Sequence, residues 1–236
     1  MSWSHIRLIM RLDTENARKY YLNEARTQGW SVRVLERNIQ TSYFERLIST
    51  QKPENSIIDQ NNIPVKEDFI KDPYVLEFLG LPENPAPKES KLESAIISHL
   101  QEFLLELGRG FSFVGRQFRI STETSHFYVD LVFYNYLLKC FVVIDLKTQK
   151  LTHQDIGQMD MYVRMFDNLK RGDDDNPTIG IILCAEKDRA IVKYSVLSDS
   201  RQIFASKYSL ILPTEEELTA ELERNANYLR EVQGDG

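Results

Sequence analysis

Three strand-like runs in close succession limit what this chain can fold into more than any other feature. They are rich in Phe, Tyr, Val and Ile, their apolar residues alternate with period two, and they span residues 111–121, 126–135 and 139–147. Runs of this length and composition are typical of adjacent strands in one sheet. We therefore expect a sheet-centred domain.

Helical patterns flank the three strands. A helix is predicted from about Lys91 to Gly108, because residues 90–93 match a capping box ahead of a periodic apolar stripe. Further elements are expected as a helix at 154–168, a strand at 178–185, a helix near 190–194, a short strand at 207–212 and a polar helix from Thr214. The order α-β-β-β-α-β from Lys91 onward predicts an α/β fold with a mixed sheet flanked by helices.

The residues before this core divide into two parts. Helical periodicity predicts one helix at 4–27 and a second at 31–48. Six of the eight prolines then lie within 53–88, which predicts a linker. Because two helices bury too little apolar surface to form a domain, we expect residues 1–52 to be part of a larger helical domain, completed by a second copy of the chain.

Charge is distributed unevenly along the chain. Residues 1–52 carry nine Lys or Arg against five Asp or Glu, whereas the other 184 residues carry 20 against 30. A basic segment beside an acidic domain suits nucleic-acid binding next to a carboxylate-rich site, although solvated arginines on a helical face would give the same balance. No apolar run approaches the ~18 residues of a membrane span, and no secretory signal is recognisable, so we expect a cytoplasmic protein with no membrane partner. Two cysteines, Cys140 and Cys184, offer neither a disulfide framework nor a zinc site.

Two carboxylates interrupt the apolar strands. If the strands at 126–135 and 139–147 join through a two-residue turn, paired residue numbers sum to 275, and Asp130 lies opposite Asp145. Lys147 shares a face with Asp145 because strand side chains alternate. An edge-strand salt bridge between Asp145 and Lys147 would also explain the pattern, but unpaired charges are costly within apolar runs.

Facing carboxylates repel each other unless a cation offsets their charge. Mg²⁺ is commonly bound by one or two carboxylates, water and a phosphate oxygen. A neighbouring lysine can hold or deprotonate an attacking water, or stabilise negative charge in the transition state. Two acids, a divalent metal and a cation therefore indicate hydrolysis of a phosphodiester bond.

Asp130 and the Asp145-Leu146-Lys147 triplet resemble the bipartite motif of the PD-(D/E)XK nuclease superfamily. The surrounding residues are similar to the bacterial YhcG-like proteins within that superfamily, in segments 114–120, 127–134, 140–147, 157–159 and 176–184. Residues 29–33 and 35–37 resemble the end of that family's amino-terminal helical domain, which is normally longer than the segment here. Family members more often have Glu at the position of Asp145.

The resemblance implies a restriction-endonuclease-like core and two further site residues. Glu93 matches the helix acid that assists metal binding, and Gln158 matches a glutamine on the helix after the D-x-K strand. The catalytic set is therefore Asp130, Asp145, Lys147, Glu93 and Gln158, with Asp130, Asp145 and Glu93 as ligands of Mg²⁺ or Mn²⁺. As alternatives, Glu93 could serve the capping box alone and Gln158 could be an exposed helix residue. For contacts to nucleic acid we name Arg33, Arg37, Arg116 and Lys150.

These observations predict a helical segment at 1–52 that binds nucleic acid or forms a homodimer, a linker at 53–88 and a nuclease domain at 89–232. The expected activity is metal-dependent hydrolysis of DNA or structured nucleic acid, in genome defence or recombination. A non-catalytic nucleic-acid-binding or assembly subunit, with the nuclease fold as a scaffold, is the alternative. Intact Asp130, Asp145 and Lys147 favour the enzyme.

Overall fold

The computed structural model describes residues 1–50, 74–82, 86–122, 124–193, 195, 197, 200 and 202–210. These residues belong to two compact units, the first containing those up to Thr50 and the second those from Tyr74 to Leu210. Each unit is described separately. No described helix is long and apolar enough to cross a membrane.

Four short helices make up the described part of the first unit: α1 (Trp3–Ile9), α2 (Glu15–Thr27), α3 (Val32–Gln40) and α4 (Tyr43–Thr50). The predictions of one helix at 4–27 and one at 31–48 were both wrong, because each range contains two shorter helices. Thr14 begins a new helix by accepting a hydrogen bond from the backbone N–H of Ala17 at 3.2 Å. Ser42, with a φ of 49°, has left-handed backbone between α3 and α4.

The breaks let the helices fold back on one another. Tyr21 and Leu35 are fully buried in a core that also contains Ile9, Ala17, Ala25 and Tyr43. The Tyr21 hydroxyl donates to the backbone oxygen of Asn38 and accepts from the N–H of Phe44, which ties α2 to both later helices. The apolar stripes that we expected a second chain to cover are therefore covered largely within this unit.

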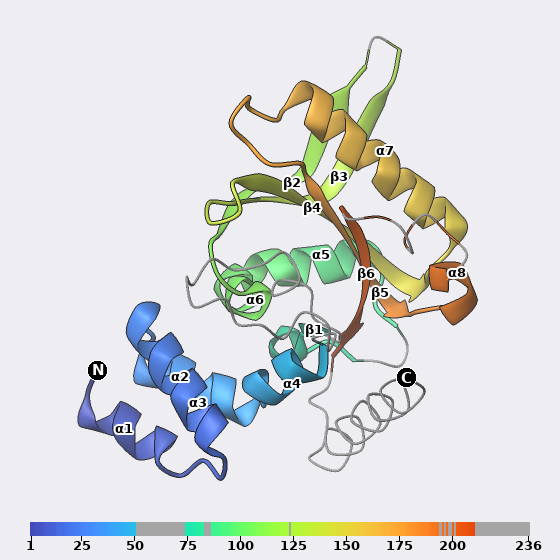
Figure 1. Cartoon of the computed structure of the whole chain (residues 1–236). Coiled ribbons are helices and arrows are strands. Elements are labelled where there is room, and N and C mark those ends of the chain that lie inside the picture. The colour runs from blue at the N-terminus through green and yellow to red at the C-terminus, as the bar shows by residue number, and fades with distance from the viewer. Residues whose placement is uncertain are drawn as a thin grey trace, which may run out of the picture. The chain divides into compact units, whose positions relative to one another are not determined.

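A sheet of six described strands forms the centre of the second unit (Figure 1). In chain order the strands are β1 (Tyr74–Val75), β2 (Phe111–Ser121), β3 (His126–Asn135), β4 (Cys140–Lys150), β5 (Ile179–Glu186) and β6 (Ile203–Ser209). Their order across the sheet is β1-β6-β5-β4-β3-β2, with parallel pairing from β1 to β4 and antiparallel pairing from β4 to β2. The predicted mixed sheet is confirmed.

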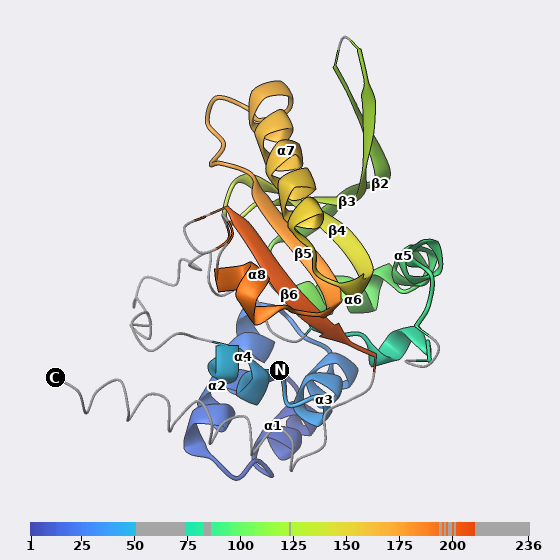
Figure 2. The same ribbon diagram turned by 90° about the vertical axis from the view of Figure 1, so that its right-hand side faces the viewer.

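Helices cover the two faces of this sheet (Figures 1 and 2). On one face α5 (Glu89–Ser98) and α6 (Leu100–Leu107) bury Leu92, Ile96, Phe103 and Leu107 against even-numbered residues of β4. On the other face α7 (His153–Leu169) buries Ile156, Met159, Val163 and Phe166 against Val143 and its neighbours, with α8 (Arg189–Lys193) beside it. Odd-numbered residues of β4 consequently face α7.

Several predicted boundaries differ from the structure. Tyr74 and Val75 lie inside the predicted linker, yet they form β1 and are fully buried, because an apolar segment can pair with the exposed edge of β6. The predicted helix from Lys91 to Gly108 is two helices that meet at His99. Strand β6 begins at Ile203 rather than at 207, and the predicted helix from Thr214 lies outside the described residues.

The register of the central hairpin is confirmed. In every β3–β4 pair, from Asn135–Cys140 to Leu131–Ile144, the two residue numbers sum to 275. The β3–β4 ladder ends there, one pair before Asp130 and Asp145, whereas the β2–β3 ladder continues to Ser121–His126. Beyond Asp130, β2 and β3 therefore leave the sheet as a two-stranded hairpin, which Figure 1 shows extending past β4 alongside α7.

Candidate active site

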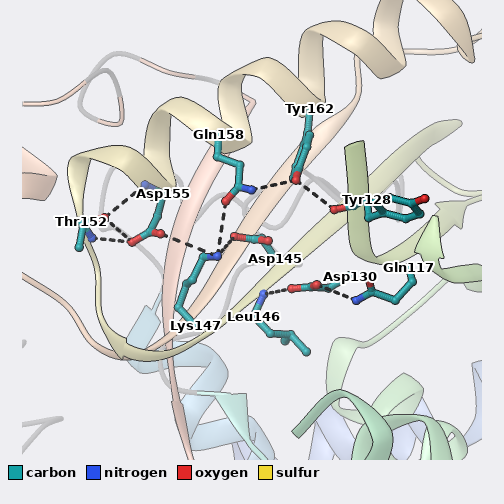
Figure 3. Close-up of polar contacts among 10 residues, drawn as sticks. All are labelled: Gln117, Tyr128, Asp130, Asp145, Leu146, Lys147, Thr152, Asp155, Gln158 and Tyr162. Carbon is teal, nitrogen blue, oxygen red and sulfur yellow. Dashed lines mark hydrogen bonds and ion pairs between the residues drawn. The ribbon is translucent and has the colours of Figure 1, made fainter. Parts of the chain in front are cut away.

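Asp130 lies at the fork where β3 separates from β4. Its Oδ2 accepts the backbone N–H of Leu146 at 2.8 Å, so a side chain takes over a hydrogen bond that a paired strand would have made (Figure 3). Val129 and Val132 both pack on the α7 side, although strict alternation would place them on opposite faces. Asp130 and Asp145 are thus neighbours across a fork, and the predicted ladder pair between them is absent from the described pairing.

Asp145 is held in an apolar environment on β4. Only 3% of the residue is exposed, and its neighbours Ile144 and Leu146 are fully buried. Burial, with the nearby charge of Asp130 as the second cause, raises the pKa of Asp145 from 3.8 to about 7. The Lys147 ammonium opposes this rise. A carboxyl in this position is costly to ionise unless a cation joins it.

Lys147 forms the cationic centre of the site. Its Nζ lies 2.9 Å from Oδ2 of Asp145 and 3.8 Å from Oδ1 of Asp155, and it donates to Oε1 of Gln158 at 3.4 Å. Burial alone would lower the pKa of Lys147, but the combined attraction of Asp145 and the more distant acids raises it. Lys147 is therefore held as an ammonium ion that points toward α7.

Apart from its ion pair, one buried oxygen of Asp145 has no partner among the described residues. This oxygen is Oδ2, which pairs with Nζ of Lys147 at 2.9 Å and has no hydrogen-bond partner in the described part of the chain. Buried carboxylate oxygens without donors are uncommon in folded proteins. The Asp145 carboxyl also lies near the charge of Asp130, and two neighbouring carboxylates suit a cation.

Helix α7 supplies the residues that orient Lys147. Thr152 and Asp155 form a capping box at its amino end, where Oδ2 of Asp155 accepts from the Thr152 backbone N–H at 2.8 Å. One turn later Gln158 accepts from Lys147, and its amide donates to the hydroxyl of Tyr162 at 2.9 Å. The Tyr162 hydroxyl donates in turn to the backbone oxygen of Tyr128 at 3.0 Å, so a continuous chain of hydrogen bonds joins β4, α7 and β3 (Figure 3).

Glu93 and Asp130 are bridged by Gln117. The Gln117 amide nitrogen donates to Oε2 of Glu93 at 2.6 Å and to Oδ1 of Asp130 at 3.0 Å. Helix α5 begins at Glu89 with Lys88 as its N-cap, so the predicted capping box at 90–93 is wrong, and the Glu93 side chain is engaged with the β2 strand instead. Gln117 has a φ of 45°, a left-handed conformation that costs about 1–2 kcal/mol in a residue other than glycine.

The donor set fits a divalent metal of the magnesium type. Asp130 and Asp145 offer hard carboxylate oxygens, and Mg²⁺ is commonly bound by one or two carboxylates completed by water and phosphate. Among the described residues no three His, Cys, Asp or Glu side chains converge as a ready metal-binding group, since Gln117 lies between Glu93 and Asp130. Two carboxylates are few ligands for a metal ion. They suit Mg²⁺, which commonly keeps several of its bound water molecules.

Sequence reasoning missed three residues that the structure places in the site. Tyr162 follows Gln158 by four positions on one helix face, and Asp155 stands three residues after Thr152, so helical spacing could have identified both. No sequence pattern marks Gln117, because its role depends on a left-handed backbone conformation and on the position of α5.

The residues predicted to contact nucleic acid are in different places. Arg116 is exposed on β2, next to Gln117. Lys150 ends β4, where its Nζ lies 3.0 Å from Oδ2 of Asp188. Arg33 and Arg37 lie on α3 of the first unit, where Arg33 is exposed and Arg37 is half-buried with contacts of its own. Of the four, Arg116 alone lies on β2, the strand that also carries Gln117.

Comparison with known proteins identifies the family of this chain. Residues 67–223 match the family described as the YhcG PDDEXK nuclease domain, and residues 1–46 match the DUF1016 N-terminal domain. The chain therefore belongs to the YhcG family of PD-(D/E)XK nuclease-domain proteins, with the expected restriction-endonuclease-like core.

One relative of known name is a protein of Escherichia coli (strain K12) called "Putative nuclease YhcG". It is 38% identical over 233 residues, which cover 97% of this chain and 61% of the relative. Among solved structures, a repair endonuclease from Pyrococcus abyssi is similar over 54% of this chain and 49% of its own, with 21% identity and a TM-score of 0.39. A structure of an EndoMS–dsDNA2 complex is similar over 52% and 46%, with 20% identity and a TM-score of 0.38.

Proposed function

We propose that this protein is a metal-dependent nuclease that hydrolyses phosphodiester bonds in DNA. The observation that carries the proposal is the buried carboxyl of Asp145, which lies beside Asp130 and whose Oδ2 has only the ion pair with Lys147 among the described residues. Lys147 supplies one positive charge, which does not offset both carboxylates. A divalent cation explains both acids.

Each residue has a role that follows from its contacts. Asp130 and Asp145 would hold Mg²⁺ or Mn²⁺, and Glu93 would reach it through water or after release from Gln117. The metal would supply a Lewis acid for the phosphate oxygens and lower the pKa of a bound water. Lys147 is restrained by contacts with Asp145, Asp155 and Gln158, so its ammonium can donate to an attacking water or to a phosphate oxygen without reorganising.

DNA as the substrate class is supported by the basic charge balance of segment 1–52, nine Lys or Arg against five Asp or Glu. The four helices of the first unit carry most of the basic residues of segment 1–52. We propose that this segment contributes phosphate contacts, since each cation that neutralises a phosphate strengthens binding.

Incubation of the pure protein with plasmid, branched and single-stranded DNA and with RNA, in Mg²⁺ or Mn²⁺, tests the proposal. We expect cleavage by the wild type, none by Asp130→Asn, and normal cleavage by Asp160→Asn, which removes an exposed-face carboxylate of α7 paired with Arg164. Calorimetry should show Mn²⁺ binding that Asp130→Asn weakens. Binding of DNA without cleavage, and without Mn²⁺ binding, would favour the non-catalytic subunit instead.

A further inference from the structure

The hairpin beyond the fork has one buried face and one open face. Phe118, Ile120, Phe127 and Val129 pack on the side of α7, and Ile120 and Val129 are almost fully buried there. The residues that alternate with them form the cross-strand pairs Arg119–Tyr128 and Ser121–His126. Because side chains alternate along a strand, these four point to the opposite side of the hairpin. We call Arg119, Ser121, His126 and Tyr128 the outer hairpin face. All four are exposed.

Arg119 is positioned on this face by hydrogen bonds. Its Nη2 lies 2.8 Å from Nε2 of His126, and because a guanidinium only donates, Nε2 is the acceptor. His126 Nδ1 then donates to Oγ of Ser121 at 2.9 Å. No described carboxylate forms an ion pair with Arg119, so its charge is held in place and available to an anion.

Tyr128 presents an aromatic ring next to the acids. The residue is 51% exposed, although the residues on both sides of it in the strand pack on the α7 side. Its backbone oxygen accepts from Tyr162, the end of the hydrogen-bond chain that begins at Lys147, whereas its side chain points away from α7 (Figure 3). The backbone of Tyr128 is therefore tied to the chain of hydrogen bonds that begins at Lys147, and its exposed ring lies on the opposite side of the strand.

The spacing matches that of a nucleic acid strand. Tyr128 precedes Asp130 by two residues, which is about 7 Å along a strand with ~3.3 Å per residue. Stacked nucleotides rise ~3.4 Å each, so the ring would lie within about two nucleotides of a phosphate bound to a metal at Asp130. Aromatic rings bind bases by stacking on a face that is exposed only when the base is unpaired or at an end.

We propose that the outer hairpin face holds the strand to be cut, with an unpaired base stacked on Tyr128 and a neighbouring phosphate paired with Arg119. This inference rests on the proposed nuclease function and narrows its substrate to single-stranded or locally unpaired DNA. A perfect duplex would contact Arg119 alone.

Binding measurements with the full chain in EDTA test this assignment without cleavage. The probes are a labelled single-stranded 20-nucleotide DNA and its duplex. Tyr128→Ala should weaken single-strand binding about tenfold, the expectation for one lost stack, and change duplex binding less than about twofold. Tyr128→Phe should bind normally, as should Tyr136→Ala, which removes an equally exposed tyrosine (62%) just after the other end of β3. Thermal melting of Tyr128→Ala against the wild type checks folding.

The arginine is tested by the salt dependence of binding. Arg119→Gln should lower the log–log slope on single strands by about 0.7, the expectation for one lost phosphate contact, whereas Arg164→Gln, an exposed arginine on α7, should leave the slope unchanged. The inference is overturned if Tyr128→Ala matches Tyr136→Ala, or if single-strand and duplex binding fall equally. A wild type that binds neither probe would overturn the proposed function itself.

Discussion

Ionisation of Asp145 should destabilise the metal-free protein as the pH rises. The carboxyl has a pKa of about 7 when folded and 3.8 when unfolded, a difference of about 3 units or ~4 kcal/mol. Below pH 3.8 it is protonated in both states and has no effect. Between the two values the folded state binds a proton that the unfolded state lacks, so the free energy of unfolding falls with increasing pH until the folded carboxyl has lost its proton above pH 7.

Comparison with Asp145→Asn isolates this effect, because the amide has nearly the same shape as the carboxyl but does not ionise. Integrating over the two pKa values, the free energy of unfolding of the variant should rise relative to that of the wild type by about 2.5 kcal/mol between pH 5 and pH 8. The variant also loses the ion pair with Lys147, but that loss adds a nearly constant offset, so the test depends on the pH trend.

Urea denaturation in EDTA at pH 5, 6, 7 and 8 measures the trend. Asp160→Asn on the outer side of α7 controls for the loss of one negative charge. Saturating Mn²⁺ should stabilise the wild type most at high pH and Asp145→Asn little. A stability difference that is flat from pH 5 to pH 8, or that reverses in sign, would refute the claim that a buried ionised carboxyl strains the metal-free site.

Substitutions at four further positions test the site and the packing of α7. Lys147→Met should keep Mn²⁺ affinity within a few-fold by calorimetry but lower kcat at least 100-fold with little change in KM, and a normal kcat would make the lysine structural. Gln117→Gly should be about 1 kcal/mol more stable to urea than Gln117→Ala, since both lose the amide but only Ala keeps the left-handed strain; equal stability would contradict this reading. Gly180→Ala should cost about 1–3 kcal/mol in urea denaturation, because its Cβ would meet Met159 Sδ at 2.5 Å on α7. Gly157→Ala, with nothing within 4 Å, should instead raise stability by up to ~1 kcal/mol, and a similar loss in both would exclude overpacking.

Local patterns in the sequence were sufficient for the elements and for the register of the central hairpin. Alternating apolar residues identified β2, β3 and β4, and the short turn between β3 and β4 determined that paired residues sum to 275. Since side chains alternate strictly along β4, the shared face of Asp145 and Lys147 was predictable as well. Helix periodicity identified α7 but missed the breaks in the first unit, because a cap such as Thr14 or a left-handed residue such as Ser42 disturbs the apolar pattern only slightly.

The tertiary structure decided how those elements combine into a site. The fork at Asp130 arises because β3 remains paired with β2 after its pairing with β4 ends. The sequence of β3 alone does not show which of its two partner strands it follows. The same divergence exposes one hairpin face, gives the Leu146 N–H a carboxylate partner and brings Gln117 to Glu93. Sequence periodicity reports which face of an element is buried; the neighbours it is buried against, and hence the pKa of Asp145, depend on packing between residues far apart in the chain.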